Sequence, residues 1–284
     1  MTYFQLPRYA TLELTGPDRI AFLQGQLTQD LALLDAGRVL RAALLTPAGR
    51  VLALATVIAG AESVVMIVPT ELAPTLAERL RRYVLRSKVR IALPGEELIV
   101  AGRGAAPAPT AAAGHERLGD GASRVRVAAG ELLLAPAAAI AAYLESDEGA
   151  GEAGWERAQV AAGEPVIVAA TAELWTAQML NLDLIGAVSF TKGCYTGQEI
   201  VARTQHLGRI KRRMFRYRSE QPISVAAGEA LTLAGAKVGE VVRAAGDGAA
   251  TEILAVVSLE ARDQPLEAAR GARFAPLPLP YAIA

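Results

Sequence analysis

Hydrophobic positions near the start of the chain change from strand spacing to helix spacing. Residues 9–14 have strand character and lead into Thr15-Gly16-Pro17-Asp18, which favours a helix start because threonine can cap a helix and proline fits its first turn. Apolar residues then recur at helical spacing, at Ile20, Leu23, Leu27 and Leu31. We therefore predict a strand followed by an amphipathic helix that runs through Leu31 and stops by Gly37.

Two apolar runs follow this helix and read as a hairpin. Residues 39–45 and 51–58 lie on either side of Thr46-Pro47-Ala48-Gly49. Proline and glycine at these positions favour a tight turn, so the two runs are predicted to pair as antiparallel strands.

A pattern of strand, turn, strand, proline and helix occurs twice. The first copy is VIAGAESVVMIVPTELAPTLAERL from Val57, and the second is VRVAAGELLLAPAAAIAAYL from Val125. Because a helix packed on a small sheet buries the apolar face of both, each copy is expected to belong to one of two related α+β lobes. The helix of the second copy is expected to reach Leu144.

After Arg209 the pattern changes to short strand candidates separated by glycine and proline, at 212–218, 230–233, 237–244 and 251–259. Such spacing is typical of a small antiparallel barrel or sandwich. The expected fold class is α+β, with two ferredoxin-like or related lobes followed by a C-terminal antiparallel β-barrel. The expected domain ranges are 1–95, 96–207 and 208–284.

Length and composition narrow the class of protein. A chain of 284 residues usually forms more than one core. Its 29 basic and 29 acidic side chains cancel, so no net charge attracts it to nucleic acid or to a membrane. The N-terminus lacks the features of a secretory signal, and every apolar run is far shorter than the ~20 residues that span a bilayer. We expect a cytoplasmic protein with no membrane partner.

Candidate chemistry concentrates in residues 181–208, around the only cysteine, Cys194. Gly193 and Gly197 let the backbone turn sharply, and a helix predicted from Gln198 would place the thiol near a helix N-terminus and close to Lys192, which favours the thiolate. A buried, inert cysteine is the alternative, and the residues alone leave both open. One cysteine and two histidines without ligand spacing predict no metal site.

The string KGCYTGQE, which continues as IVARTQHLGRIKRR, resembles the signature of the YgfZ family, a relative of the folate-dependent aminomethyltransferase of the glycine cleavage system. Two further stretches support the resemblance: FLQGQLTQDL from Phe22, and GEPVIVAATAELWTAQMLNLDLIGAVSF from Gly163. The similarity therefore touches the beginning, the middle and the start of the last third of the chain.

The resemblance implies a tetrahydrofolate-binding accessory factor for the assembly or repair of iron–sulfur proteins, including enzymes that thiolate tRNA. It implies tetrahydrofolate or a one-carbon derivative as cofactor, and iron–sulfur client or assembly proteins as partners, without an established turnover reaction. Lys192 would help hold the folate, Arg157 would contact the folate tail, and Cys194 would be the residue most needed for activity. Tyr195 would stack on the pterin or fill the core.

Two other functions remain open. One is a true aminomethyltransferase acting on a lipoyl-bound intermediate, against which the KGCYTGQE string argues. The other is an RNA-binding adaptor that uses RIKRRMFRYR at 209–218, where six basic residues surround Phe215 and Tyr217. We favour the interpretation of this run as an alternating strand with a solvated outer face.

Overall fold

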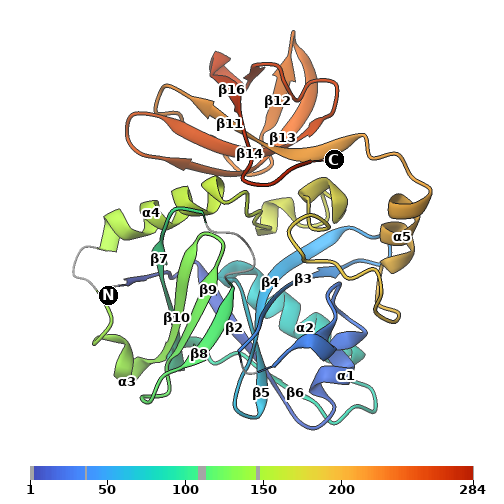
Figure 1. Ribbon diagram of the computed structural model, residues 1–284, viewed down its shortest axis with the longest axis vertical. Helices are drawn as coiled ribbons and strands as arrows, with labels where there is room; N and C mark the ends of the chain where they lie inside the picture. The colour runs from blue at the N-terminus through green and yellow to red at the C-terminus, as the bar shows by residue number, and fades with distance from the viewer. Residues whose placement is uncertain (1–2, 36, 108–112, 145–147, 284) are drawn as a thin grey trace.

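Two sheets lie side by side beneath a barrel in the computed structural model, which describes residues 3–35, 37–107, 113–144 and 148–283 (Figure 1). Within these residues, each sheet has five strands and the barrel is closed by six. Every strand pair of the two sheets and the barrel is antiparallel. The expected α+β class with a C-terminal antiparallel β-barrel is confirmed.

The first sheet contains the predicted hairpin. Its strand order is β3 (Val39–Leu45), β4 (Val51–Ala59), β5 (Ser63–Pro69), β2 (Tyr9–Thr15) and β6 (Arg90–Ala92). Gly49 closes the β3–β4 turn with a φ of 71°, a conformation that glycine adopts without strain. Helix α2 (Ala73–Tyr83) buries Leu76 and Leu80 against this lobe.

The second sheet includes the start of the chain. Its order is β1 (Phe4–Gln5), β7 (Leu98–Gly104), β10 (Gly130–Pro136), β9 (Ser123–Val127) and β8 (Gly114–Arg117). Strand β1 pairs with β7, whereas β2, a few residues later, belongs to the first sheet. The two sheets are therefore joined through the N-terminal segment, and the domain ranges proposed from the sequence stay predictions.

The first predicted helix is much shorter than its hydrophobic spacing indicated. Helix α1 covers only Arg19–Gln24 and ends at Gly25, and Leu31 falls in a separate 3-10 turn, Leu31–Leu33. The side chains of Leu23, Leu27 and Leu31 are all buried, so the spacing predicted which residues enter the core but not the path of the backbone. The main-chain carbonyl groups at the end of α1 and in the loop after it accept hydrogen bonds from Lys192, a residue far along the chain.

The helix of the second repeat is also shorter than expected. Helix α3 ends at Ile140 (Ala137–Ile140) rather than at Leu144. Helix α4 (Glu148–Ala161) lies between the second sheet and the barrel (Figure 1). The helix predicted to begin at Gln198 is confirmed as α5 (Gln198–His206). The other 3-10 turns are Thr70–Leu72, Gly95–Glu97, Ala169–Thr171, Gln178–Leu180 and Ala269–Gly271.

The barrel runs in the order β11 (Arg212–Ser219), β14 (Thr251–Ser258), β13 (Ala236–Gly246), β12 (Ala230–Leu233), β15 (Leu266–Glu267) and β16 (Arg273–Leu277). Its apolar interior includes Tyr217, Ile253 and Phe274. The segment between α4 and α5 returns along the first sheet, where Val51 N donates to Trp175 O (2.8 Å).

The strand interpretation of the basic run is confirmed by β11. Each of its four arginines pairs with a carboxylate: Arg212 with Glu240, Arg213 with Asp183, Arg216 with Glu252, and Arg218 with Glu220 and Glu252. These pairs neutralise the basic charge that an RNA-binding strand would present. Only Arg209 and Lys211, which precede the strand, are exposed members of the run.

Within the described part of the chain, no helix is long and apolar enough to cross a bilayer.

Candidate functional site

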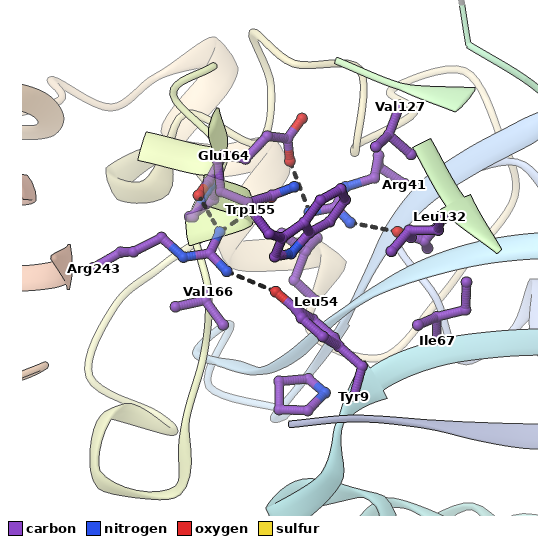
Figure 2. Close-up of a pocket in the computed structure, with 14 residues that line it drawn as sticks. Tyr9, Arg41, Leu54, Ile67, Val127, Leu132, Trp155, Glu164, Val166 and Arg243 are labelled. Carbon is purple, nitrogen blue, oxygen red and sulfur yellow. Dashed lines mark hydrogen bonds and ion pairs between the residues drawn. The ribbon is translucent and has the colours of Figure 1, made fainter. Parts of the chain in front are cut away.

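A cavity of about 390 Å³ opens near the start of β2 and the strand β13 of the barrel. Its walls come from the first lobe, from α4, from the segment after α4 and from the barrel: Arg8, Tyr9, Pro69, Thr70, Glu71, Glu156, Val166, Val168 and Arg243. A smaller pocket of about 30 Å³, drawn in Figure 2, shares Tyr9, Pro69, Val166 and Arg243 with it. We call the two together the central cavity.

Arg243 organises one side of the central cavity. The side chain comes from β13 and is 4% exposed, and its Nε lies 3.0 Å from Glu156 Oε2. Its Nη2 donates to Tyr9 Oη (2.6 Å), and its Nη1 donates to Gln159 Oε1 (3.1 Å) and to Glu164 O (3.1 Å). Burial acts to lower the pKa of Arg243, but contacts with Tyr9, Glu156 and Glu164 outweigh it, so the pKa lies above the ordinary value.

A second, partly buried ion pair lies on the other side of the cavity. Arg41 Nη2 is 2.8 Å from Glu164 Oε2, and the Glu164 side chain is 8% exposed. Arg41 Nη1 also donates to Thr56 Oγ1 on the neighbouring strand (2.6 Å). Figure 2 shows the two arginines approaching the cavity from opposite sides, with the indole of Trp155 between them.

The aromatic groups give the central cavity an apolar face. Tyr9 and Trp155 meet edge to face, with ring centroids 6.5 Å apart and planes at 89°. Among the described residues, Trp155 Nε1 is buried and has no hydrogen-bond partner. A cavity with apolar walls, an unused N–H donor and two arginine–carboxylate pairs is suited to a flat, polar heterocycle.

Lys192 lies outside the central cavity and already uses its ammonium hydrogens. Its Nζ donates to the main-chain carbonyls of Gln24 (2.7 Å), Leu27 (2.6 Å) and Gln29 (2.9 Å). Burial lowers the pKa of Lys192 to about 8, and nearby Asp30 acts in the opposite direction.

Cys194 and Tyr195 face opposite ways on the same loop. Cys194 is exposed, which excludes the buried, inert cysteine. Tyr195 is buried beneath Lys192, whose Nζ lies 5.0 Å from the ring centroid, and burial raises the pKa of Tyr195 to about 12. The structure therefore brings Lys192, Cys194 and Tyr195 together, with Tyr195 in the core and none of the three in the wall of the central cavity.

Arg157 is not part of this group. It is exposed on α4, and its Nη1 donates to Gly246 O at the end of β13 (3.2 Å). Its neighbours in sequence, Trp155, Glu156 and Gln159, are the α4 residues that line the central cavity. The folate contacts predicted for Arg157, Lys192 and Tyr195 stay predictions.

Sequence reasoning missed most of the central cavity. Tyr9, Arg41, Glu164 and Arg243 are far apart in the chain and share no motif. One signal was present: polar residues recur on the cavity side of α4 at Glu156 and Gln159, three positions apart, which places them on one helix face.

Comparison with known proteins identifies the family. No family model matches the chain. A tRNA-modifying protein YgfZ from Yersinia pseudotuberculosis serotype O:1b is 30% identical over 248 residues, which cover 81% of this chain and 75% of the relative. The chain belongs to the YgfZ family. YgfZ proteins from Cronobacter sakazakii and Serratia proteamaculans are 30% and 29% identical, and each match covers 76% of this chain and 70% of the relative.

The family resemblance that rests on KGCYTGQE is thus confirmed, and the fold agrees with it. The crystal structure of glycine cleavage system aminomethyltransferase T from Bartonella henselae matches with a TM-score of 0.77, over 98% of this chain and 85% of that chain. At 17% sequence identity this match shows that the YgfZ chain has an aminomethyltransferase-like fold.

Proposed function

We propose that this YgfZ protein binds tetrahydrofolate, or a one-carbon derivative of it, in the central cavity and acts as an accessory factor in the assembly or repair of iron–sulfur proteins. Its clients would include enzymes that thiolate tRNA, in keeping with the name of its relatives, tRNA-modifying protein. It would act in the cytoplasm. The observation that carries the proposal is the pairing of a ligand-sized cavity with an exposed single thiol outside its walls.

The residues of the central cavity fit a reduced folate. The volume of about 390 Å³ falls within the range of small-molecule sites, roughly 300 to 1,000 Å³. The pterin ring requires hydrogen bonds and apolar walls, which Glu156 and Val166 provide in the larger part of the cavity, and Trp155 lines the smaller part beside it. The Arg8 side chain is 53% exposed at the cavity. Its Nε lies 2.5 Å from Glu152 Oε1 and its Nη1 lies 3.4 Å from Glu156 Oε1, and a guanidinium has five N–H donors, so further N–H groups would be available for a folate carboxylate. Bound folate would supply a carrier of one-carbon units.

We propose that Cys194 is the residue of this chain that acts on the client protein. A cluster normally takes four protein ligands and this chain has one thiol, so we do not assign a cluster scaffold to a single chain. An exposed thiol can share ligation with a partner or take part in thiol exchange.

Calorimetric titration with tetrahydrofolate tests the cavity. Val168→Trp places an indole in the larger part of the central cavity without removing any charged group, so binding should weaken by at least about tenfold, the effect of losing 1.4 kcal/mol. Val238→Trp is the matched control, because Val238 is partly buried in the barrel and does not line the cavity.

Equal affinities for the wild type, Val168→Trp and Val238→Trp would contradict the cavity assignment. Failure of the wild type to bind any reduced folate would contradict the cofactor itself. A one-carbon transfer assay with a lipoyl-bound substrate examines the rival aminomethyltransferase function, for which we expect no activity.

A further inference from the structure

The Cys194 loop is fixed to the rest of the molecule at few points. On one side of it, Ser189 N donates to Thr28 O (2.9 Å) and, on the other, Thr196 N donates to Gly25 O (3.3 Å). Between these two backbone contacts, the side chain of Lys192 provides the tie to the loop after α1.

The three carbonyls that Lys192 binds belong to the last residue of α1 and to the loop that follows it. The carbonyl groups at a helix C-terminus have no partner within the helix, and a cation placed there is favourable to both the unpaired groups and the helix dipole. Gln24 is the last residue of α1, and Leu27 and Gln29 follow it in the non-helical loop. Lys192 therefore satisfies three main-chain acceptors here, of which that of Leu27 belongs to a buried residue and the other two to partly buried residues.

The ammonium has no hydrogen left for a ligand. An ammonium group carries three N–H donors, and each has a main-chain acceptor within 2.9 Å. The Lys192 ammonium also lies over the Tyr195 ring, which anchors the loop on the far side of Cys194. Lys192 and Tyr195 thus hold the loop to the rest of the molecule on either side of the exposed Cys194 thiol.

We propose that Lys192 is a positioning residue: by binding the carbonyls of Gln24, Leu27 and Gln29, it fixes the Cys194 loop on the first lobe and holds the thiol toward solvent. The inference rests on the proposed function only in treating Cys194 as the working thiol. Folate and client proteins are not needed to test it.

The first test uses the fact that Cys194 is the only cysteine, so a nitroxide label attaches there without other substitutions. Lys192→Met keeps the apolar stem and removes the donors, while Lys237→Met is the control at an exposed lysine. Electron paramagnetic resonance should show faster label motion in Lys192→Met than in the wild type or Lys237→Met. Amide exchange over 24–29 should rise by at least about tenfold, because hydrogen bonds to a charged group are lost.

Unchanged label motion and unchanged exchange over 24–29 in folded Lys192→Met would overturn the proposal. The rival assignment, Lys192 as a folate contact, predicts that result together with weakened tetrahydrofolate binding. If the wild type binds no folate, the exchange and label measurements still decide the positioning role.

A second measurement needs no variant. The chain has only four lysines, and Lys88, Lys211 and Lys237 are exposed. In protein labelled with ¹⁵N-lysine, a hydrogen-bonded ammonium should exchange slowly enough to give one resolved signal at about pH 6, where Lys192 is charged. Absence of any slowly exchanging ammonium would overturn the proposal even if Lys192→Met failed to fold.

Discussion

At the scale of single residues, Lys192 combines strong hydrogen bonds with a charge that burial opposes. Burial lowers its pKa to about 8 from the ordinary value of 10.5. Between these two pH values the unfolded chain holds the proton more readily than the folded chain. The contribution of Lys192 to the free energy of unfolding therefore rises with pH across this window and is lost as the pH falls through about 8. A neutral amine still donates two hydrogen bonds to the same carbonyls.

The first prediction follows from the rise of the Lys192 contribution to the free energy of unfolding with pH. The difference in unfolding free energy between the wild type and Lys192→Met should increase from about pH 7 to about pH 10. Urea titrations at several pH values measure it, and Lys237→Met, at an exposed lysine, should show no such trend. A difference that stays constant or decreases with pH would count against the buried ammonium.

The second prediction concerns the thiol. Because Cys194 is exposed and does not line the central cavity, iodoacetamide should alkylate it in the native protein, and saturating tetrahydrofolate should leave the rate unchanged. Mass spectrometry of the alkylated chain over time gives the rate. Reaction only after denaturation would show that the loop is closed in solution.

At the scale of secondary-structure elements, the start of α5 depends on Gly197. This residue has a φ of 81°, and a Cβ there would lie 2.5 Å from Thr46 O in the β3–β4 turn. The close approach places the loop that carries Cys194 directly against the first sheet. A side chain at position 197 would therefore displace either the loop that carries Cys194 or the β3–β4 turn.

We therefore expect Gly197→Ala to lower the free energy of unfolding by about 1–3 kcal/mol, the usual cost of a strained backbone position. Gly193→Ala is the matched control, because a Cβ there meets nothing within 4 Å, and its effect should be within about 0.5 kcal/mol. Denaturant titration of both variants measures the difference. Equal stability of the two variants would remove the case for a close packing of α5 on the turn.

Elements with a clear period and a turn signal were predictable from the sequence. The β3–β4 hairpin, helix α2 and the barrel strand β11 follow from alternation, from leucines four apart and from flanking glycine or proline. Helix α1 was predicted too long because Leu27 enters the core from the loop after the helix, and Leu31 enters it from a separate 3-10 turn. That loop is stabilised by Lys192, a contact across more than 160 residues that no local pattern contains.

The candidate site also has one part that the sequence predicted and one part that it did not. The KGCYTGQE segment was recognisable because its residues are consecutive, whereas the central cavity is built from single residues on several elements. Arginines and glutamates that face the cavity resemble surface charges in a sequence. Only tertiary packing shows that Glu164 and Arg243 are buried and that Arg41 is partly buried.

At the scale of the whole molecule, a buried ion pair ties the barrel to the segment that precedes the Cys194 loop. Arg213 of β11 binds Asp183 through two hydrogen bonds of 2.9 and 2.8 Å, and the two side chains are 8% and 7% exposed. Arg213 also donates to Asn181 Oδ1 (3.3 Å). This contact is one of the buried polar contacts that join the barrel to the rest of the molecule.

Removal of Asp183 should therefore leave a buried guanidinium without its carboxylate. We expect Asp183→Ala to lower the free energy of unfolding by about 3 kcal/mol or more. Glu220→Ala is the control, since Glu220 pairs with Arg218 at the surface with 81% of its side chain exposed, and its loss should matter by less than about 1 kcal/mol. Similar losses in the two variants, measured by thermal or urea unfolding, would contradict a structural role for the buried pair.

The most direct test of the proposed function is rescue of a strain that lacks the gene, scored by the activity of iron–sulfur enzymes. We expect the wild type and Val238→Trp to restore activity, and Cys194→Ala and Val168→Trp not to restore it, with all four proteins present at equal levels. Full restoration by both Cys194→Ala and Val168→Trp would contradict the claim that this YgfZ protein serves iron–sulfur proteins through an exposed thiol and a folate cavity.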